Sequence, residues 1–452
     1  MFLVGLIAFT SCSRDNDSSC LIPKPDAEVA ILNMPENSEL VQNEKIALKA
    51  SIQDVVTSGD FYWTVNGKRV DDEALVNPSD STFTFSQSEL GDYTVGLNYQ
   101  EEDRTADASE TIHVYGQFRD GTFVLNEGAG SKENGSVIFI SSAGEITPNA
   151  YKSVNGKEIG NVTQDLYIAD SKIYFISQNQ PKEALAPVAG VLVVAHAETL
   201  EAIASYTKEL EELSLPTHLA VVDQYIYIRD NNGIHRFNPS TEELELVAES
   251  SGAAKNRMAV VGKYIFAFAG KKLLVIKKGD NKVTKTIEFE ASISGLVKSS
   301  DDQLWISINK PSNKIIKLNP ENFTQVEQSL TLGGLSAGWG ATPAFGAKGE
   351  TLYFTNNTTT IYSHSFESGE TKELGQLSNF VSEDTNTLYN NIGVDPISGD
   401  LYLNTILGFG DKYLKNNISV LNYEGDKGVL VKNYKHHTHF PAGVFFTSNF
   451  KK

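Results

Sequence analysis

Two patterns in the sequence predict an all-β protein in which a small β-sandwich precedes a seven-bladed β-propeller. Residues 27–115 contain short alternating runs, such as KIALKASI and STFTFS, which are separated by turn residues and show no helical period. From Gly116 onward, a triplet with a central aromatic residue recurs at intervals of 51, 53, 39, 39, 48 and 49 residues. These intervals fit the repeat of about 40–50 residues that builds four-stranded propeller blades. The seven central residues are Phe123, Tyr174, Tyr227, Phe266, Trp305, Tyr353 and Tyr402.

The N-terminal run MFLVGLIAFT is apolar but too short to span a bilayer as a mature helix. It ends in small residues directly before Cys12, and the residues FTSC resemble the lipobox of bacterial lipoproteins. We therefore expect a signal peptide at 1–11, lipidation of Cys12 and a polar tether at 12–26, with an ordinary cleaved signal as the alternative. The acidic residues soon after Cys12 also resemble the surface-export signal of Bacteroidota lipoproteins.

The segment 27–115 is predicted to be a small antiparallel sandwich. Trp63 and Tyr93 stand where immunoglobulin-like and PKD-like sandwiches place a core tryptophan and a late-strand tyrosine, and the absence of a cysteine pair here makes PKD-like the better description. Between Lys24 and Tyr115, 18 acidic residues oppose 6 basic ones, so this segment holds most of the net charge of −19. Such a charge suits a soluble surface spacer and argues against a nucleic-acid partner, which would need clustered lysine and arginine.

The segment 116–452 is predicted to form the propeller. Each aromatic triplet from the second onward follows another apolar run across a short turn and precedes two more runs, which gives four strands, A to D, per blade. The first triplet has no A strand before it, whereas the C-terminal run FPAGVFFTSNF has no partner. We expect the C-terminal run to supply the innermost strand of the first blade and to close the ring, because closure removes exposed sheet edges.

The loops between strands B and C are expected to carry the ligand-binding function. In a propeller, the BC loops and the DA connections share one face, and the AB turns lie on the other. The AB turns here are minimal, whereas the BC loops of blades seven, one and two are long: NTILGFGDKYLKNN, NEGAGSKENG and SQNQPKEALAPVAG. Ring closure makes these blades neighbours, so the long loops should gather on one sector. Long loops are costly to order and are usually retained for function.

The predicted ligand contacts come mainly from this sector, with additions from the third BC loop and two DA connections. Amides, carboxylates and aromatic rings suit a polar ligand with an apolar face, such as a sugar or a corrinoid. A loop that only caps the tunnel is the alternative. The predicted ligand-binding residues are Asn126, Glu127, Gln178, Asn179, Arg229, Asp230, Trp339, Phe409, Asp411, Lys412, Tyr413, His437 and His439.

The signals for enzymatic chemistry are weaker, so we expect a binding protein that has no catalytic residues, metal or cofactor. Both cysteines lie near the N-terminus, which excludes disulfides and cysteine-based sites from the body of the chain. A metal site on His437 and His439 remains an alternative. So does a propeller enzyme of lactonase or glycoside hydrolase or lyase type, in which Glu127 would act as an acid or a cation ligand.

The run FVLNEGAGSKENGSVIFI, followed by SVNGKEIGNVTQDLYIADSKIYFISQN, resembles the start of the YncE-like propeller domain of Bacteroidota surface lipoproteins, where a PKD-like module often precedes it. Relatives of this kind capture cobalamin on a seven-bladed propeller and pass it to a TonB-dependent outer-membrane transporter. The resemblance implies an outer-membrane, lipid-anchored protein at the cell surface that binds a small nutrient ligand and serves such a transporter. It does not carry over the ligand, and an adhesion or structural role remains a further alternative.

Overall fold

The computed structural model describes residues 27–53, 59–72, 74–77, 81–101, 104–338, 342–383, 386–390 and 392–450. Its contacts divide the chain into two compact units between Gly116 and Gln117. Cys12, the expected signal peptide and the tether lie outside the described residues, as does Trp339. None of the helices in the described part of the chain has the length and hydropathy to cross a membrane.

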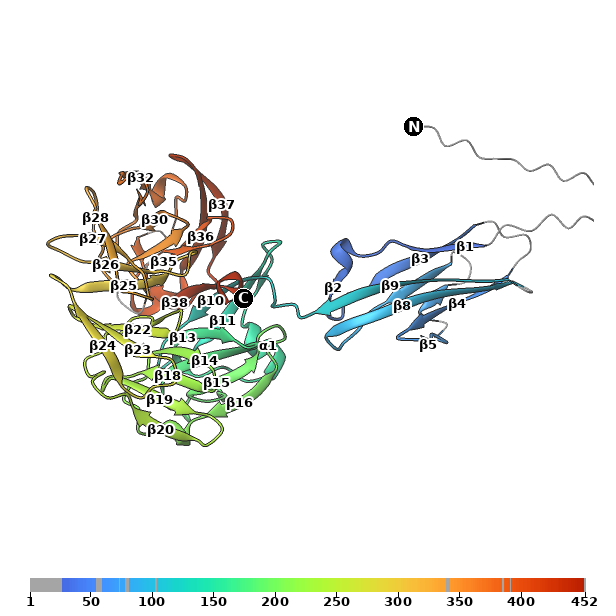
Figure 1. Ribbon diagram of the computed structural model, residues 1–452, viewed down its shortest axis with the longest axis horizontal. Coiled ribbons are helices and arrows are strands. Elements are labelled where there is room, and N and C mark those ends of the chain that lie inside the picture. The colour runs from blue at the N-terminus through green and yellow to red at the C-terminus, as the bar shows by residue number, and fades with distance from the viewer. Residues whose placement is uncertain are drawn as a thin grey trace, which may run out of the picture. The chain divides into compact units, whose positions relative to one another are not determined.

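The first unit is a two-sheet β-sandwich (Figure 1). Trp63 is fully buried between the sheets, and its ring centroid lies 5.4 Å from that of Phe83. Trp63 therefore lies in the core of the sandwich, as the sequence predicts. One sheet has the order β1 (Glu28–Leu32), β3 (Ile46–Gln53), β7 (Thr82–Phe85) and β6 (Val76–Asn77); the other has β2 (Glu39–Val41), β9 (Arg104–Tyr115), β8 (Gly91–Glu101), β4 (Asp60–Val65) and β5 (Lys68–Arg69), and the short helix η1 (Glu36–Ser38) precedes β2.

The second unit contains seven sheets among its described residues, which confirms the predicted all-β propeller architecture. In Figure 1 the inner strands, such as β13 and β25, lie toward the middle of the unit, and the outer strands, such as β20 and β28, lie at its periphery. Blades 2 to 4 consist of β13 (Asn161–Ala169), β14 (Lys172–Asn179), β15 (Leu192–His196) and β16 (Ala202–Tyr206); β17 (His218–Val222), β18 (Tyr225–Arg229), β19 (Ile234–Asn238) and β20 (Glu243–Leu246); and β21 (Ala259–Val261), β22 (Tyr264–Ala269), β23 (Lys272–Lys277) and β24 (Val283–Glu288).

Blades 5 to 7 follow the same order, except that two short strands share the inner position of blade 7. Blades 5 and 6 consist of β25 (Ile293–Lys298), β26 (Leu304–Ile308), β27 (Lys314–Leu318) and β28 (Gln325–Ser329), and of β29 (Phe345–Lys348), β30 (Thr351–Phe354), β31 (Thr360–Ser365) and β32 (Thr371–Gln376). In blade 7, β33 (Thr387–Leu388) and β34 (Gly393–Val394) both pair with β35 (Leu401–Ile406), which is followed by β36 (Asn416–Glu424) and β37 (Lys427–Lys435).

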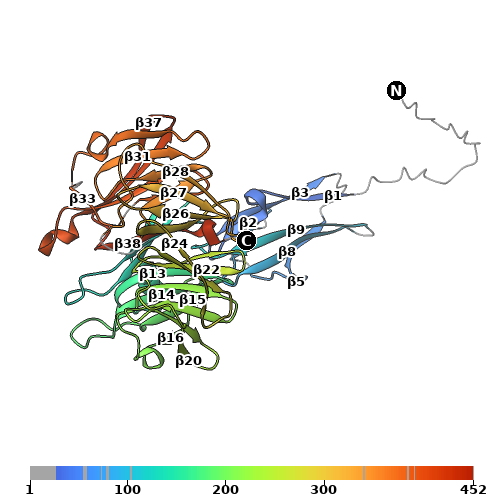
Figure 2. The same cartoon turned by 60° about the vertical axis from the view of Figure 1, so that its left-hand side comes forward.

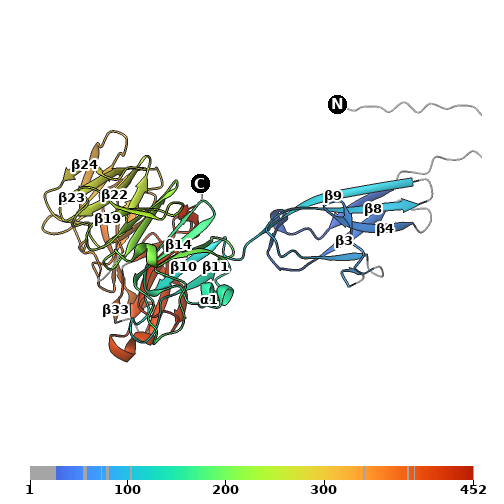
Figure 3. The same cartoon turned by 90° about the horizontal axis from the view of Figure 1, so that it is seen from below.

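Blade 1 is built from both ends of the propeller unit. Strand β38 (Pro441–Phe446) pairs antiparallel with β10 (Gly121–Asn126), which is followed by β11 (Ser136–Ser141) and β12 (Ile146–Thr147). The helix α1 (Ala150–Asn155) then contacts β11 on the way to blade 2 (Figure 3). This pairing gives β10 a neighbour on each side, so blade 1 holds the first and last strands of the unit together.

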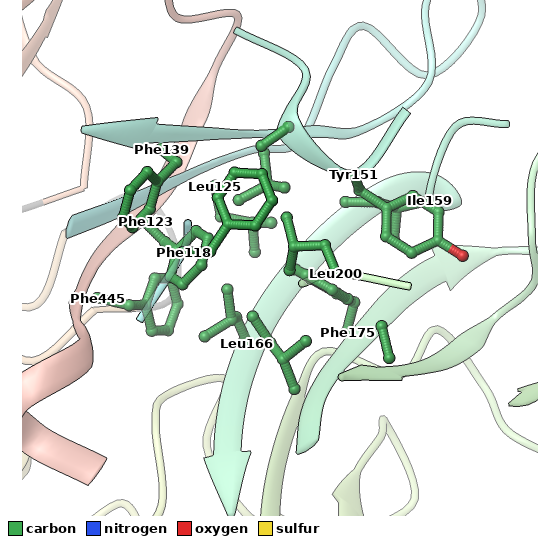
Figure 4. Close-up of a cluster of buried hydrophobic side chains, with 14 of the residues drawn as sticks. Phe118, Phe123, Leu125, Phe139, Tyr151, Ile159, Leu166, Phe175, Leu200 and Phe445 are labelled. Atoms are coloured by element: carbon green, nitrogen blue, oxygen red, sulfur yellow. The ribbon is translucent and has the colours of Figure 1, made fainter. Parts of the chain in front are cut away.

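The core of the propeller is divided into clusters that lie between neighbouring blades. Along β10, Phe123 and Leu125 pack toward blade 2, whereas Val124 packs toward blade 7. Figure 4 shows the first of these clusters, in which Phe123 and Phe139 of blade 1 lie beside Leu166 and Phe175 of blade 2. Since successive strand side chains point to opposite faces and both faces are covered, these strands read as nearly continuous apolar runs. For this reason, the recurring aromatic triplets identify the B strands of the blades in the sequence.

Candidate functional site

The long BC loops of blades 1, 2 and 7 contact one another. Figure 2 shows the teal and green loops of blades 1 and 2 and the orange-red segment of blade 7 projecting from one side of the ring. Lys182 Nζ of loop 2 donates a 2.6 Å hydrogen bond to the carbonyl of Gly130 in loop 1, and Tyr413 of loop 7 donates through its hydroxyl to Glu133 of loop 1 at 3.1 Å. We name these segments loop 1 (127–135), loop 2 (180–190) and loop 7 (407–415), the last of which contains helix η4 (Gly410–Leu414).

A chain of three asparagines, of which Asn134 and Asn161 are buried and Asn179 is partly exposed, holds the base of loops 1 and 2. The Asn161 amide donates to Asn134 Oδ1 at 3.0 Å, and the Asn179 amide donates to Asn161 Oδ1 at 3.0 Å. Asn134 also donates to the carbonyl of Ala186 at 2.9 Å. Asn179, a predicted ligand contact, therefore positions the loops. The neighbouring Gln178 lies partly exposed at the end of β14.

Four aromatic rings gather where loop 7 meets the connection into β38. Phe440 stacks on Tyr413 with 5.0 Å between ring centroids and on Phe409 with 6.3 Å, and Tyr389 lies 5.3 Å from it. Tyr413 is buried, whereas Phe409 keeps 56% of its surface exposed. Phe409 thus offers an aromatic face to solvent on a rigid support, which is a good arrangement for stacking a ligand.

Glu127 lies partly buried beneath this aromatic group. Its backbone N–H donates to the carbonyl of Phe440 at 2.8 Å, and its carboxylate accepts a 3.4 Å hydrogen bond from the Tyr389 hydroxyl. Burial raises the pKa of the Glu127 carboxyl, although Lys255 and hydrogen bonds from Gln164, Tyr389 and Asn390 act in the opposite direction. Burial and the Glu127 charge raise the pKa of the Tyr389 hydroxyl as well.

The histidine segment before β38 binds loop 1. His439 Nδ1 pairs with Glu133, and the His439 backbone N–H donates to Asn126 Oδ1 at 3.2 Å. Asn126 is buried and also donates to Ser136 Oγ at 3.1 Å, so it joins loop 1 to the closing connection. Burial lowers the pKa of His437, and the neighbouring His436 lowers it further.

Asp230 is buried within its own turn. Its carboxylate accepts backbone N–H groups of Ser214, Asn232 and Gly233 at 2.8 to 3.0 Å, and His235 lies 3.2 Å away. Burial alone would raise the pKa of Asp230, but these donors lower it to about 2. The carboxylate of Asp230, a predicted ligand contact, is therefore already hydrogen-bonded to the protein's own backbone. Aspartate readily accepts hydrogen bonds from the backbone of a tight turn.

The remaining predicted contacts differ in their surroundings. Arg229 is buried and donates to the carbonyl of Ala253 at 3.0 Å and to Thr217 Oγ1 at 3.2 Å, which gives it a structural role between blades 3 and 4. Lys412 is exposed beside Phe409 in loop 7. The Asp411 side chain and Trp339 lie outside what the structure describes.

The opposite face of the propeller contains a cavity that loop length did not predict. It has a volume of about 1080 Å³, and its mouth is bordered by the AB turns and by helix η5 (Thr447–Phe450). Its floor holds an ion pair in which Arg257 Nε lies 3.4 Å from Asp165 Oδ1. The loop lengths predict ligand binding only on the BC-loop face. The cavity lies on the other face because the short AB turns leave the tunnel mouth open.

The Asp165–Arg257 pair joins four blades across the tunnel. Asp165 accepts the Leu219 backbone N–H at 3.1 Å, while Arg257 lies 3.9 Å above the Phe445 ring and fits against Gly443, where a side chain would collide with it. Burial raises the pKa of Asp165 to about 6 although Arg257 and the Leu219 N–H act to lower it. The sequence signals this site only by one acidic residue, Asp165, in the strand sequence VTQDLYIA.

The BC-loop face brings together several kinds of side chain. It combines an exposed aromatic ring, amides, and two carboxylates, Glu127 and Glu133, that each bind a neighbouring side chain. No cluster of three or more histidine, cysteine or acidic residues able to hold a metal ion occurs among the described residues. Three contributors that the sequence analysis missed are Tyr389, Phe440 and Glu133; Phe440 directly follows the histidine segment that it did identify.

Comparisons with solved structures show similarity of fold. The chain resembles a quinoprotein alcohol dehydrogenase-like protein from Bacteroides thetaiotaomicron with 13% identity and a TM-score of 0.56, over 90% of this chain and 96% of that one. Two weaker likenesses have TM-scores of 0.40. The first is to the extracellular domain of a putative hybrid two-component system from the same species, at 13% identity over 59% of this chain and 32% of that one. The second is to PorZ, a surface component of the type-IX secretion system of Porphyromonas gingivalis, at 14% identity over 76% of this chain and 44% of that one.

No curated protein matches the chain. The family described as a domain of unknown function, DUF5074, matches residues 120–447, which cover nearly all of the propeller. The chain therefore belongs to the DUF5074 family.

Proposed function

We propose that this protein is a non-enzymatic binding protein whose propeller holds a small ligand on its BC-loop face. The observation that supports the proposal is the arrangement of loops 1, 2 and 7, which come from neighbouring blades and are joined by side-chain hydrogen bonds. A ligand site needs groups held in place before the ligand arrives, because ordering them on binding would reduce the affinity. These contacts provide that order.

The proposed ligand has an apolar face and polar substituents. Phe409, supported from below by Phe440, would stack on the apolar face, and the exposed Lys412 would contact polar groups beside it. A corrinoid such as cobalamin and a glycan both have this chemistry. The resemblance to cobalamin-capturing surface propellers favours the first, and the amide-rich loops suit the second.

The proposed location is the outer membrane, at the cell surface, with an anchor on Cys12. This part of the proposal rests on the lipobox-like FTSC run and the acidic tether in the sequence. A protein held there by a PKD-like spacer would present its ligand to a TonB-dependent transporter. An adhesion or structural module is the alternative for the same location, and it predicts a bound membrane protein with no small-molecule ligand.

An enzyme of lactonase or glycoside hydrolase or lyase type is a second candidate. The observation that favours it is Glu127, whose raised pKa would suit a proton donor and which lies against the Tyr389 hydroxyl. Catalysis of glycoside hydrolysis also needs a second carboxylate about 5–10 Å away. The carboxylate of Asp230, one of the predicted ligand contacts, is hydrogen-bonded to backbone N–H groups of the protein.

A ligand panel tests the proposal. The full chain would be screened by thermal shift against cobalamins and glycans, and any hit would be measured by titration calorimetry. Phe409→Ala should weaken the hit by about 10-fold or more, as expected for loss of an aromatic anchor. Val326→Ala is the matched control, because Val326 is also an exposed apolar side chain (60%) but lies in the outer strand β28 of blade 5, outside both the BC loops and the AB-turn cavity. The absence of any hit together with turnover of a lactone or glycoside would overturn the proposal.

A further inference from the structure

The cavity on the AB-turn face has the size and depth of a ligand site. Its volume of about 1080 Å³ lies just above the range of about 300–1,000 Å³ that is typical of small-molecule sites. All blades contribute to its lining, from Asp170 in blade 2 to Phe450 in helix η5. A cavity of this size admits a ligand with more than one ring.

Several of the charged groups that line this cavity are in ion pairs, and Asp170, Asp223 and Lys278 also line it. At the rim, Asp302 pairs with Lys298 at 2.8 Å and Glu321 pairs with Lys263 at 3.2 Å. Asp301 pairs with Lys317 at 2.7 Å, and at the floor Asp165 faces Arg257. An ionic ligand at the floor would be attracted by one member of that pair and repelled by the other. This balance favours a neutral ligand.

Arg257 provides a hydrogen-bonding group at the floor of the cavity. Its side chain keeps 24% of its surface open and lines the cavity, so a ligand can reach it. The Asp165 side chain is only 3% exposed and holds the arginine in place. A ligand hydroxyl can accept a hydrogen bond from the arginine.

Apolar and aromatic side chains form the wall between floor and rim. Met258 and Val444 border the middle of the cavity, and Tyr167 and Phe450 meet edge to face near the mouth, with 5.2 Å between ring centroids. Ring-shaped ligands with hydroxyls at their edges and C–H groups on their faces match such a wall. The polar rim residues Ser300, Gln303 and Asn319 add further hydrogen-bonding groups.

We propose that the AB-turn cavity is a second binding site, which takes a neutral polyhydroxylated ligand of two or more rings, that is, an oligosaccharide, with an inner hydroxyl on Arg257. This site is separate from the BC-loop site and does not depend on it.

The test is calorimetric titration of the full chain with maltotriose, cellotriose and chitotriose. At least one should bind with a Kd of about 1 mM or tighter. Ser300→Trp places a bulky ring at the mouth from an exposed turn position and should weaken that binding about 10-fold or more, with an unchanged melting temperature. Phe450→Ala, which removes the rim aromatic without adding bulk, should weaken it about fivefold and serves if Ser300→Trp does not fold.

Two controls separate this site from the BC-loop site. Ser240→Trp adds the same side chain at an exposed serine outside the cavity lining and should leave trisaccharide binding unchanged. Phe409→Ala should also leave it unchanged. The proposal is overturned if no trisaccharide binds at about 10 mM, or if binding survives both Ser300→Trp and Phe450→Ala. Loss of all trisaccharide binding in Phe409→Ala would equally overturn it and would support the BC-loop site instead.

Discussion

The two faces of the propeller use loop length in opposite ways. On the BC-loop face, the long loops of three neighbouring blades contact one another through polar groups, as Tyr413 does with Glu133. On the AB-turn face, short turns surround a cavity of about 1080 Å³. Long loops can form a ligand-binding surface, whereas short turns leave the central tunnel open as a cavity. The two kinds of site predict different responses to mutation.

The largest effect is expected at the cavity floor. Arg257→Met removes the guanidinium but leaves Asp165 buried, and breaking a buried ion pair in this way costs about 3–5 kcal/mol of unfolding free energy. Urea denaturation of the variant measures this. The double variant Asp165→Asn/Arg257→Met should recover most of the loss, and a single variant as stable as the wild type would show that the pair does not hold the blades together.

The unfolding free energy is expected to depend on pH because of the same ion pair. The pKa of Asp165 is raised in the folded protein from its ordinary value of 3.8 to about 6. The stability linked to this group is therefore fully present below about pH 4 and is lost as the pH rises through about 6, by at most about 3 kcal/mol. Asp165→Asn should abolish this decline. Parallel pH profiles of unfolding free energy for the variant and the wild type between pH 4 and 7 would contradict the assignment.

The pH dependence of stability that Asp230 causes, on the BC-loop side, should have the opposite sign. Its pKa is lowered to about 2, so its contribution is present above about pH 4 and is lost as the pH falls through about 2. Asp230→Ala also leaves the turn's N–H donors of Ser214 and Asn232 without their acceptor. We expect a loss of about 2 kcal/mol at pH 7. Asp223→Asn, at an exposed AB turn, is the control and should change stability by less than about 0.5 kcal/mol.

The smallest effect is expected at Glu127. Glu127→Gln keeps an acceptor for the Tyr389 hydroxyl and removes a charge that burial disfavours, so the unfolding free energy at pH 8 should rise by up to about 1 kcal/mol. Ligand binding should stay within a few-fold of the wild type. A fall in any lactonase or glycosidase turnover by about 100-fold would instead assign Glu127 a catalytic role.

The blades were predictable because their signal is local and repeated. Strand side chains of β10 and its counterparts are buried on both faces, so the aromatic triplets recur at blade length. The gathering of the long loops followed from the neighbouring positions of blades 7, 1 and 2. Both inferences need only the order of the strands.

The character of individual loop residues was not predictable in the same way. Asp230 and Phe409 both lie in BC loops. The Asp230 carboxylate accepts hydrogen bonds from backbone N–H groups of its own turn, whereas the Phe409 side chain stays 56% exposed. Tyr413 was expected at the surface and is buried against Phe440. The pairing of Asp165 with Arg257 depends on distances across the tunnel between blades 2 and 4, which no local pattern encodes.

The most direct test of the binding function is the affinity of Phe409→Ala and Val326→Ala for the tightest binder in the panel of cobalamins and glycans. Both variants should unfold like the wild type, since each loses one exposed apolar side chain. Phe409→Ala is expected to bind about 10-fold or more weakly, and Val326→Ala is expected to bind normally. Equal affinity in the two variants, or no binder for the wild type, would contradict a ligand site on the BC-loop face.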